Sequence, residues 1–201
     1  MKKLSDILDN PTIWKLFRDS FDLFFGIYRK RKKLLKVWEI AGKNYSVLDI
    51  ACGIGQFSDI TRGPYLGVDL NNQYIERAKK LYNAPNISFQ CIDVKDLYKE
   101  NKQYDIVLLI GIAHHLDKDT LSDLLTVVHQ IARKSVVLIE VAHEQNTPWG
   151  KWLRNNDRGK FVRPQNTLKK IISESDFKIK DCVFIRSWGI NTTAIYFTQN
   201  Q

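Results

Sequence analysis

Apolar side chains change their spacing along this chain, and the change marks where helices give way to strands. In residues 12–41, bulky apolar residues recur every three or four positions, which predicts a helix with one apolar face and a bend near Gly26. After Gly42 the apolar residues form short continuous runs instead, the pattern of strands that are buried on both faces. The predicted helical face consists of Trp14, Phe17, Phe21, Phe24, Phe25 and Tyr28.

Apolar runs that alternate with polar or helical segments predict five buried strands. A short helix is expected at 56–61, a second after the capping residues Asn71 and Asn72, and a third from Asp117, whose carboxylate suits the N-terminal end of a helix dipole. Pro164 is expected to start the last helix, and the runs KIKDCVFI (178–185) and TTAIYFTQ (192–199) to form an antiparallel pair. The five buried runs are YSVLDIA (45–51), PYLGVDL (64–70), NISFQCID (86–93), YDIVLLIG (104–111) and SVVLIEVA (135–142).

The alternation of strands and helices predicts an α/β fold with a doubly wound sheet and right-handed crossovers. We expect residues 1–45 to form an N-terminal helical cap or lid, and residues 46–201 to form the main domain. Residues 143–163 show little regular pattern, which indicates a functional loop or small lid on the substrate side. Ligands of such sheets bind beyond the carboxyl ends of the strands, so the residues at those ends are the candidates for function.

Composition places the chain among ordinary globular proteins. Of its 201 residues, 44% are hydrophobic and 26% are charged, and no apolar run approaches the roughly 20 residues that cross a bilayer. The first ten residues lack the apolar stretch of a secretory signal. The three cysteines are far apart and form no CxxC pair, so we expect neither a disulfide framework nor a metal site, and we expect a cytoplasmic location.

The net charge of +9 is concentrated near the start of the chain. Residues 1–45 hold 11 lysines and arginines against 5 acidic residues, and the run RKRKK at 29–33 supplies much of the excess. One interpretation of this run is a solvated helix face. The other is attraction to an anionic partner, which could be an acidic membrane surface, nucleic acid or a phosphorylated substrate.

The end of the first strand carries a carboxylate and two glycines rather than a complete phosphate-binding loop. The strand leads through Asp49 into Gly53 and Gly55, and Ser58 stands where a dinucleotide fingerprint has its third glycine. A plain tight turn would also explain these two glycines. Asp69 lies 20 residues after Asp49, where a carboxylate can accept hydrogen bonds from a ribose diol, although helix capping would also account for it.

The third strand ends at Asp93, which could accept a hydrogen bond from an adenine amino group or could simply form a turn. Taken with Asp49 and Asp69, this position favours a ligand that contains ribose and adenine, tolerates a nearby negative charge and needs no phosphate contacts. S-adenosylmethionine has these properties, because it combines an adenine nucleoside with an ammonium and a sulfonium cation.

The segments VLDIACGIGQFS, YLGVDLNNQYIERAKK, ISFQCIDVKDL and YDIVLLIGIAHHLD resemble successive motifs of the class I S-adenosylmethionine-dependent methyltransferases. The resemblance covers about residues 46–142 and continues weakly beyond them. It implies a seven-stranded sheet of order 3-2-1-4-5-7-6, with strand 7 antiparallel. Ala51 departs from the pattern, because the family usually has glycine there.

The resemblance also implies which residues surround the cofactor. The methionine part would lie over the two glycines of the loop, the ribose hydroxyls would bind the carboxylate that ends the second strand, and the adenine would lie at the ends of the second and third strands. The residues implied are Asp49, Ala51, Gly53 and Gly55 for methionine, Asp69 for ribose, Leu70, Asp93 and Val94 for adenine, and Ile110 near the transferred methyl.

The methyl acceptor is less sharply specified. The segment IGIAHHLD lacks the Asn or Asp, proline and aromatic pattern of enzymes that methylate bases or glutamine, and neither Cys52 nor Cys91 is placed as a nucleophile. The chain is more similar to small-molecule methyltransferases. His115 or His143, which follow strands expected to be neighbours, could act as a general base, although the His114–His115 pair could also be structural.

We therefore expect methyl transfer to an O or N atom of a small or lipid-linked acidic molecule, with S-adenosylhomocysteine as the product. Arg158 would hold the acidic group of the acceptor. The N-terminal basic segment would close over the cofactor as a lid or dock peripherally on an anionic membrane. The alternatives are an RNA or protein methyltransferase that uses this segment, a binding module without catalysis, and a nicotinamide oxidoreductase.

Overall fold

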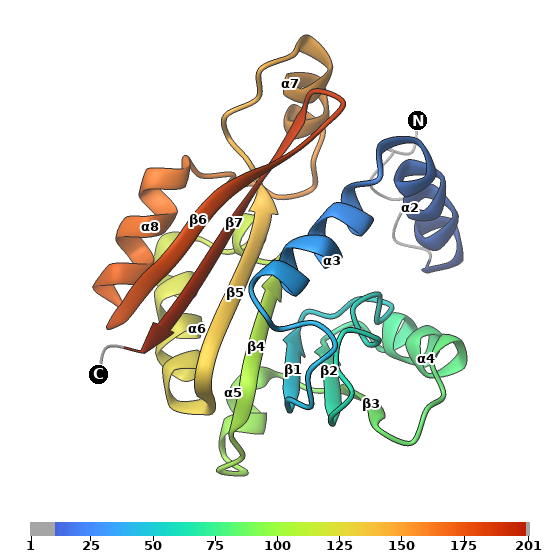
Figure 1. Ribbon diagram of the computed structural model, residues 1–201, viewed down its shortest axis with the longest axis vertical. Coiled ribbons are helices and arrows are strands. Elements are labelled where there is room, and N and C mark those ends of the chain that lie inside the picture. Colours follow the sequence, from blue (N-terminus) through green and yellow to red (C-terminus); the bar gives the residue numbers. More distant parts are fainter. Residues whose placement is uncertain (1–10, 200–201) are drawn as a thin grey trace.

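One seven-stranded sheet forms the centre of the protein in the computed structural model, which describes residues 11–199 (Figure 1). The strand order is β3-β2-β1-β4-β5-β7-β6, and β7 runs antiparallel to both of its neighbours. The α/β fold and the strand order implied by the resemblance are thus confirmed. The strands are β1 (Val47–Ile50), β2 (Tyr65–Asp69), β3 (Ile87–Cys91), β4 (Tyr104–Ile110), β5 (Ala132–Val141), β6 (Phe177–Ser187) and β7 (Ile190–Gln199).

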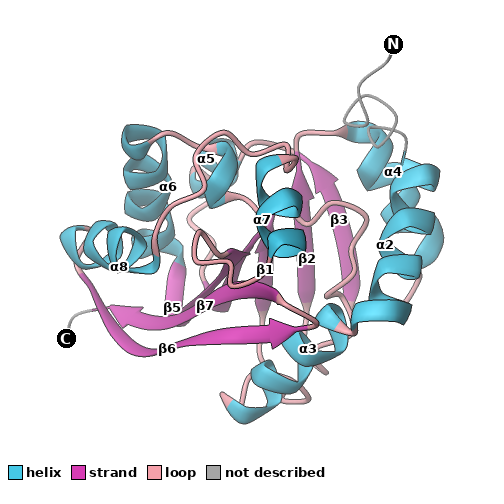
Figure 2. Ribbon diagram, turned by 90° about the horizontal axis from the view of Figure 1, so that it is seen from above, coloured by secondary structure: helices cyan, strands magenta, loops and turns pink. Residues whose placement is uncertain are grey.

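Helices cover both faces of the sheet, as the view from above shows (Figure 2). Side chains of α5, α6 and α8 pack on one face, and side chains of α3 and α4 pack on the other. The α-helices are α2 (Pro11–Phe25), α3 (Ile27–Val37), α4 (Asn72–Leu81), α5 (Val94–Tyr98), α6 (Lys118–Ile131), α7 (Pro148–Asn155) and α8 (Gln165–Glu174), and a 3₁₀ helix, η1, spans Ala113–His115.

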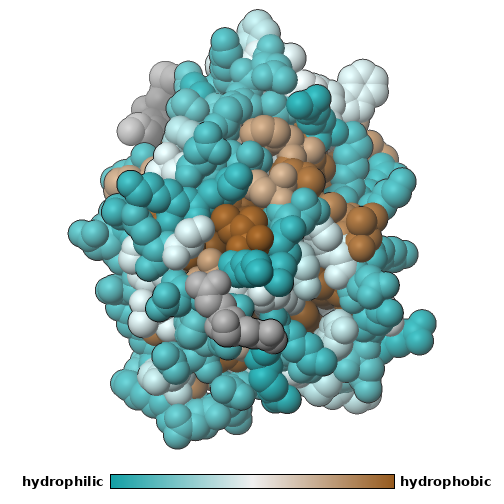
Figure 3. All heavy atoms as spheres, turned by 60° about the vertical axis from the view of Figure 1, so that its left-hand side comes forward, coloured by the Kyte–Doolittle hydropathy of each residue, from teal (hydrophilic) through white to brown (hydrophobic). Residues whose placement is uncertain are grey.

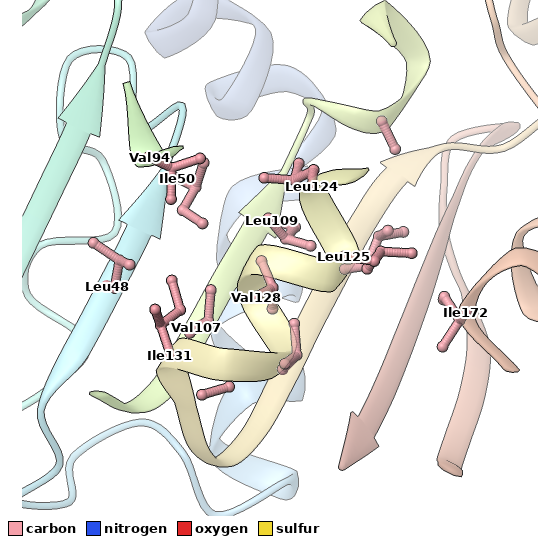
Figure 4. Close-up of a cluster of buried hydrophobic side chains, with 14 of the residues drawn as sticks. Leu48, Ile50, Val94, Val107, Leu109, Leu124, Leu125, Val128, Ile131 and Ile172 are labelled. Atoms are coloured by element: carbon pink, nitrogen blue, oxygen red, sulfur yellow. The ribbon is translucent and has the colours of Figure 1, made fainter. Parts of the chain in front are cut away.

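The helix α6 illustrates how the sequence pattern becomes packing. Asp117 caps it by accepting a hydrogen bond from the Thr120 backbone N–H at 2.8 Å. Its apolar residues repeat at helical spacing and lie over β1 and β4, where they form one of the two cores (Figure 4). All of the residues predicted for this face are buried, namely Leu121, Leu124, Leu125, Val128 and Ile131.

The N-terminal helical extension breaks where the sequence predicts a bend. Gly26 has a φ of 60°, a left-handed angle that ends α2 and lets α3 start in a new direction. On α3, Ile27 and Leu35 are buried against the sheet, whereas Phe24 at the end of α2 is 73% exposed and does not belong to a buried face. The side chains of Trp14, Phe17 and Phe21, which complete the predicted apolar face, lie outside the described residues.

The predicted helix at 56–61 is wrong, and the structure contains two helices, α5 and α7, that the sequence pattern did not predict. Residues 56–61 form successive turns rather than a helix, because their hydrogen bonds reach back only three residues, as from Ser58 N–H to the Gly55 carbonyl at 3.1 Å. The five-residue α5 is too short to leave a periodic pattern. The segment 143–163 contains α7, because Thr147 accepts a hydrogen bond from Gly150 N–H at 3.0 Å and Pro148 fits the first turn.

Hydrophilic and apolar side chains are distributed unevenly over the surface. The side of α8 and β6, which comes forward in Figure 3, is mostly hydrophilic, with a limited apolar patch near its middle. Between residues 11 and 199, no helix is both long enough and apolar enough to span a bilayer. Large apolar side chains are exposed on α2, on α7 and at the tip of the β6–β7 hairpin, namely Leu16, Leu23, Phe24, Trp149, Trp152 and Trp188.

Candidate functional site

The first strand leads into a loop that faces open space at Gly53, whereas Gly55 packs against Phe89. Ala51, Gly53 and Gly55 have left-handed φ angles of 58°, 56° and 78°. A Cβ added at Gly53 would meet no heavy atom within 4 Å, so a ligand can approach this backbone closely. Alanine in the left-handed region costs about 1–2 kcal/mol. The residue that departs from the family pattern, Ala51, therefore holds local backbone strain.

Asp69 ties this loop to the end of β2. One of its carboxylate oxygens accepts a hydrogen bond from Gly53 N–H at 2.9 Å, and the other accepts one from Asn71 N–H at 2.8 Å. Asn71 in turn caps α4 through its side chain. Each carboxylate oxygen can accept a second hydrogen bond, so Asp69 can hold the loop and still bind a hydroxyl pair.

Asp49 lies beneath the same loop and is only 2% exposed. Its carboxylate accepts a hydrogen bond from the Tyr65 hydroxyl at 2.6 Å. Burial raises the pKa of Asp49 to about 7, the charge of Asp69 adds to this rise, and the bond from Tyr65 only partly opposes it. A cation placed beside Asp49 would favour its ionised form.

The other positions implied for the cofactor lie at the ends of β2, β3 and β4. Leu70 is 73% exposed, so its side chain offers apolar surface that a ligand can cover. Asp93 caps α5 by accepting a hydrogen bond from Lys95 N–H at 2.8 Å, and Val94 is buried behind it. Ile110 is partly buried at the end of β4.

A cleft of about 300 Å³ opens between the N-terminal helices and the loop that follows β1. Gln56, next to Gly55, lines it from the loop, and Tyr82 lines it from the end of α4. Three of the residues on the helical side are Asp22, Leu23 and Arg29. The N-terminal helices thus form one wall of a cavity that borders the glycine loop.

A buried carboxylate, Glu140, organises the ends of β4 and β5. It is 2% exposed, and one of its oxygens accepts hydrogen bonds from the backbone N–H groups of Ile112 at 2.8 Å and Ala113 at 2.6 Å. Its other oxygen bonds to Nδ1 of His114, and Nε2 of the same imidazole lies 3.1 Å from an Asp157 carboxylate oxygen. The imidazole is therefore enclosed between two carboxylates.

This arrangement fixes the charge of His114. Burial would lower its pKa, but the hydrogen bonds to Asp157 and Glu140 and their charges outweigh burial and raise the pKa to about 10. Burial would likewise raise the pKa of Asp157, but the hydrogen bond to His114 and its positive charge lower the pKa instead. At neutral pH His114 is a cation held between two anions.

The same network holds the segment after α7 against η1. Phe161 N–H donates to the His114 carbonyl at 2.9 Å, and Arg163 donates to the carbonyls of Ala113 at 2.7 Å and Leu116 at 2.6 Å. A Cβ added at Gly159 would lie 1.9 Å from the His114 ring, so only glycine allows this approach. The segment 157–163 is therefore fixed beside the ends of β4 and β5.

His115 and Arg158, two of the acceptor-side residues predicted from sequence, lie close to this network. His115 is exposed, and its ring centroid lies 4.2 Å from that of His114. Partial burial lowers the pKa of His115, and the positive charges of His114 and Arg158 lower it further. His115 is thus neutral at pH 7, whereas His114 is not.

His143, the third predicted residue, is placed differently. It is exposed, and its backbone carbonyl accepts a hydrogen bond from Arg154 at 2.7 Å. In the described part of the chain, its imidazole makes no hydrogen bond or ring contact. The charge of Arg158 acts on His115, and in the described residues no hydrogen bond or ring contact joins His143 to either of them.

Reasoning from sequence missed Glu140 and Asp157. Glu140 had a visible signal, because it is the only charged residue in the apolar run SVVLIEVA and would have to be buried with a partner. Asp157 had none, because its contact with His114 spans more than forty positions between two loops.

We expect the His114 ring to remain protonated at pH 8 and to titrate near pH 10. Because its pKa is raised on folding, its contribution to stability is complete below about pH 6.5 and is lost as pH rises through about 10. NMR titration of the ring, assigned by its absence in His114→Asn, measures the pKa. Glu140→Gln should lower it. A ring that titrates near pH 6.5 in the wild-type protein would show that the network does not hold a cation.

Comparison with known proteins supports the interpretation of the glycine loop. A family model described as "Methyltransferase domain" matches residues 47–135, from β1 into β5. Phthiotriol/phenolphthiotriol dimycocerosates methyltransferase 1 of Mycobacterium ulcerans is 33% identical over 81 residues, which make up 38% of this chain and 29% of that protein. The match thus spans less than a third of this relative's length.

Solved structures share the fold across most of the chain. A SAM-dependent methyltransferase from Aquifex aeolicus superposes with a TM-score of 0.70 at 16% identity, covering 94% of this chain and 98% of the other. Magnesium protoporphyrin IX methyltransferase from Synechocystis, solved with bound SAH, has a TM-score of 0.67 at 14% identity and covers 86% and 82% of the two chains. Residues 47–135 therefore match a methyltransferase domain, and the strand order is the one implied by the resemblance to the class I S-adenosylmethionine-dependent methyltransferases.

Proposed function

We propose that this chain transfers the methyl group of S-adenosylmethionine to an oxygen or nitrogen atom of a small or lipid-linked acidic molecule. The observation that carries the proposal is the placement of Asp49 and Asp69 around the open glycine loop, inside the segment that matches a methyltransferase domain. A buried carboxylate of raised pKa suits a cationic ligand, and a carboxylate with free acceptor positions suits a ribose.

The residues fit this cofactor at each strand end. The open space at Gly53 accommodates the methionine part, with Asp49 near its cationic groups. Asp69, which holds Gly53 and has acceptor positions left over, would bind the ribose hydroxyls, and the exposed Leu70 would cover one face of the adenine. The adenine edge would then lie at Asp93 and Val94, and the transferred methyl near Ile110, as the family resemblance implies.

When bound, the cofactor supplies a methyl group on a positively charged sulfur, which an acceptor lone pair attacks in line. The chain contributes alignment and, at the acceptor, a base. His114 cannot take a proton at neutral pH, because it is already protonated. His115 is neutral and exposed beside it, so we assign the base to His115 rather than to His143.

Two features support a small or lipid-linked acidic acceptor. The positive charge of Arg158 lies near His115, where it would attract an acidic group. Trp149 and Trp152 of α7 stack with ring centroids 5.0 Å apart and remain about half exposed, which offers an apolar wall. The relative from M. ulcerans is named for methyl transfer to phthiotriol and phenolphthiotriol dimycocerosates, which is in keeping with this class.

We assign the N-terminal helices to a lid rather than to a membrane anchor or an RNA-binding segment. Lys30 donates to the Arg186 carbonyl at the end of β6 at 2.6 Å, and Lys32 bonds to Asp59 and lies 4.7 Å from the Tyr28 ring centre. Much of the basic run is therefore engaged within the chain. The basic run is therefore less available to bind an acidic membrane or RNA.

Asp69→Ala is expected to weaken S-adenosylmethionine binding by about 10- to 100-fold, because hydrogen bonds to a charged group contribute about 1.5–3 kcal/mol. Titration calorimetry measures this, with Asp123→Ala, an exposed carboxylate on α6, as the control. Since Asp69 also holds Gly53, the stability of the variant is measured without ligand. Unchanged affinity in Asp69→Ala would rule out the ribose assignment.

The function itself is tested with S-adenosylmethionine labelled in its methyl group and separate lipid, small-molecule, RNA and protein extracts. We expect label in an acidic lipid or small molecule. His115→Ala should lower turnover by about 10²–10⁴-fold with unchanged cofactor affinity, His143→Ala should have little effect, and Arg158→Ala should mainly raise the acceptor KM. Label confined to RNA or protein would refute the acceptor class, and full turnover in His115→Ala from pH 6 to 9 would refute the base.

A further inference from the structure

Arg31 occupies an unusual position on α3. It follows Ile27 and precedes Leu35 at steps of four, so it lies on the stripe that faces the sheet, and both of these neighbours are buried. Arg31 is itself partly buried. Its Nε is shielded from solvent and has no hydrogen-bond partner. Buried guanidinium groups normally form hydrogen bonds, so a donor left in this state needs an explanation.

The residues on either side prevent Arg31 from turning outward. Lys30 is held by the Arg186 carbonyl at 2.6 Å, and Lys32 is held by Asp59 in the turns after the glycine loop. These contacts join α3 to β6 and to the turns after β1, and together they limit its rotation. Arg31 lies between these two lysines on the stripe of α3 that carries the buried residues Ile27 and Leu35, and its Nε is shielded from solvent.

The carboxylates that influence Arg31 are already engaged. Burial lowers the pKa of Arg31, and the charges of Glu140 and Asp22 oppose this effect. Glu140, however, is bonded to two backbone N–H groups and to His114, and Asp22 accepts a hydrogen bond from Tyr28 N–H at 2.6 Å. Neither carboxylate forms a hydrogen bond or ion pair with Arg31 in the described residues.

The charge of Glu140 acts on Arg31, so Arg31 lies in the same part of the fold as Glu140. Glu140 lies near the end of β5, next to η1 and His115, where the acceptor is proposed to bind. The protonated His114 partly offsets the negative charges of Glu140 and Asp157, which weakens the repulsion of a further anion at this edge. Arginine binds carboxylate and phosphate oxygens in a two-pronged geometry, which would satisfy the free donors.

We propose that Arg31 is an anion-binding residue of the acceptor site and that its guanidinium binds an oxyanion, a carboxylate or phosphate group, of the methyl acceptor. The identification of this ligand as the acceptor rests on the proposed function. The anion site itself does not, because it follows from the unpartnered donor and the fixed helix. It assigns a role to one residue of the RKRKK run that the intramolecular contacts leave unexplained.

Inorganic phosphate and acetate serve as probes in thermal unfolding at constant ionic strength. Phosphate or acetate should raise the unfolding temperature of the wild-type protein along a saturating curve. Arg31→Met should lose this rise, because methionine has a similar length but no charge. Lys33→Met, which removes the same charge from an exposed position on the same helix, should keep it. Equal rises in Arg31→Met and the wild type, or no rise in the wild type with either anion, would overturn the proposal.

Arg31→Lys keeps the charge but not the two-pronged geometry. This variant tests the anion-binding proposal if Arg31→Met does not fold. It should bind the probe anion at least tenfold more weakly than the wild type, and equal binding would overturn the proposal. With the methyl acceptor, Arg31→Met should raise KM at least tenfold and leave kcat within a few-fold. An anion effect that depends on Arg31 without any methyl transfer would refute the proposed function while the anion site stands.

Discussion

Parallel strands place their carboxyl ends along one edge of the sheet, and in this chain the residues there include the carboxylates Asp49, Asp69 and Glu140. Each must be compensated, because an ionised group out of water is costly. Asp69 receives two backbone N–H groups, and Glu140 receives two more together with a protonated imidazole. Asp49 has the Tyr65 hydroxyl, and its pKa remains raised to about 7. The carboxylates at this edge are thus compensated by hydrogen-bond donors or a cation, except that Asp49 is only partly compensated.

A second group without full compensation is Arg31 on α3. The Nε of Arg31 is shielded from solvent and has no hydrogen-bond partner among the described residues, and Asp49 is a buried acid whose one side-chain hydrogen bond comes from Tyr65. A cationic nucleoside beside Asp49 and an acidic acceptor beside Arg31 would correct both. Between them, the Glu140–His114–Asp157 network holds η1 and the segment 157–163 in place, so the groups that would meet the acceptor are positioned before it arrives.

Sequence patterns were sufficient where local periodicity determines structure. The apolar runs predicted the strands, and the repeat from Leu121 to Ile131 predicted α6, because burial of one face leaves a regular signature. The turns at 56–61 and the short α5 lie below the length at which periodicity is informative.

Only part of the candidate site could be predicted from the sequence, for a different reason. Asp49, Asp69 and the glycine loop are adjacent to strands, so their positions follow from topology. The charge of His114 depends on Glu140 and on Asp157, which comes from a loop more than forty residues away. The inward orientation of Arg31 likewise depends on contacts of Lys30 and Lys32 with distant segments. Such long-range pairs leave no spacing in the sequence that could reveal them.

Titration calorimetry of S-adenosylmethionine at pH 6 and pH 8 tests the central claim most directly. A cation bound beside Asp49 requires its ionised form, and the free protein holds this carboxyl with a pKa of about 7. The affinity of the wild-type protein should therefore be about tenfold weaker at pH 6 than at pH 8. Asp49→Asn should not show this change, and it corrects for titration of the ligand's own amine. Absence of binding, or the same pH dependence in both proteins, would contradict the account.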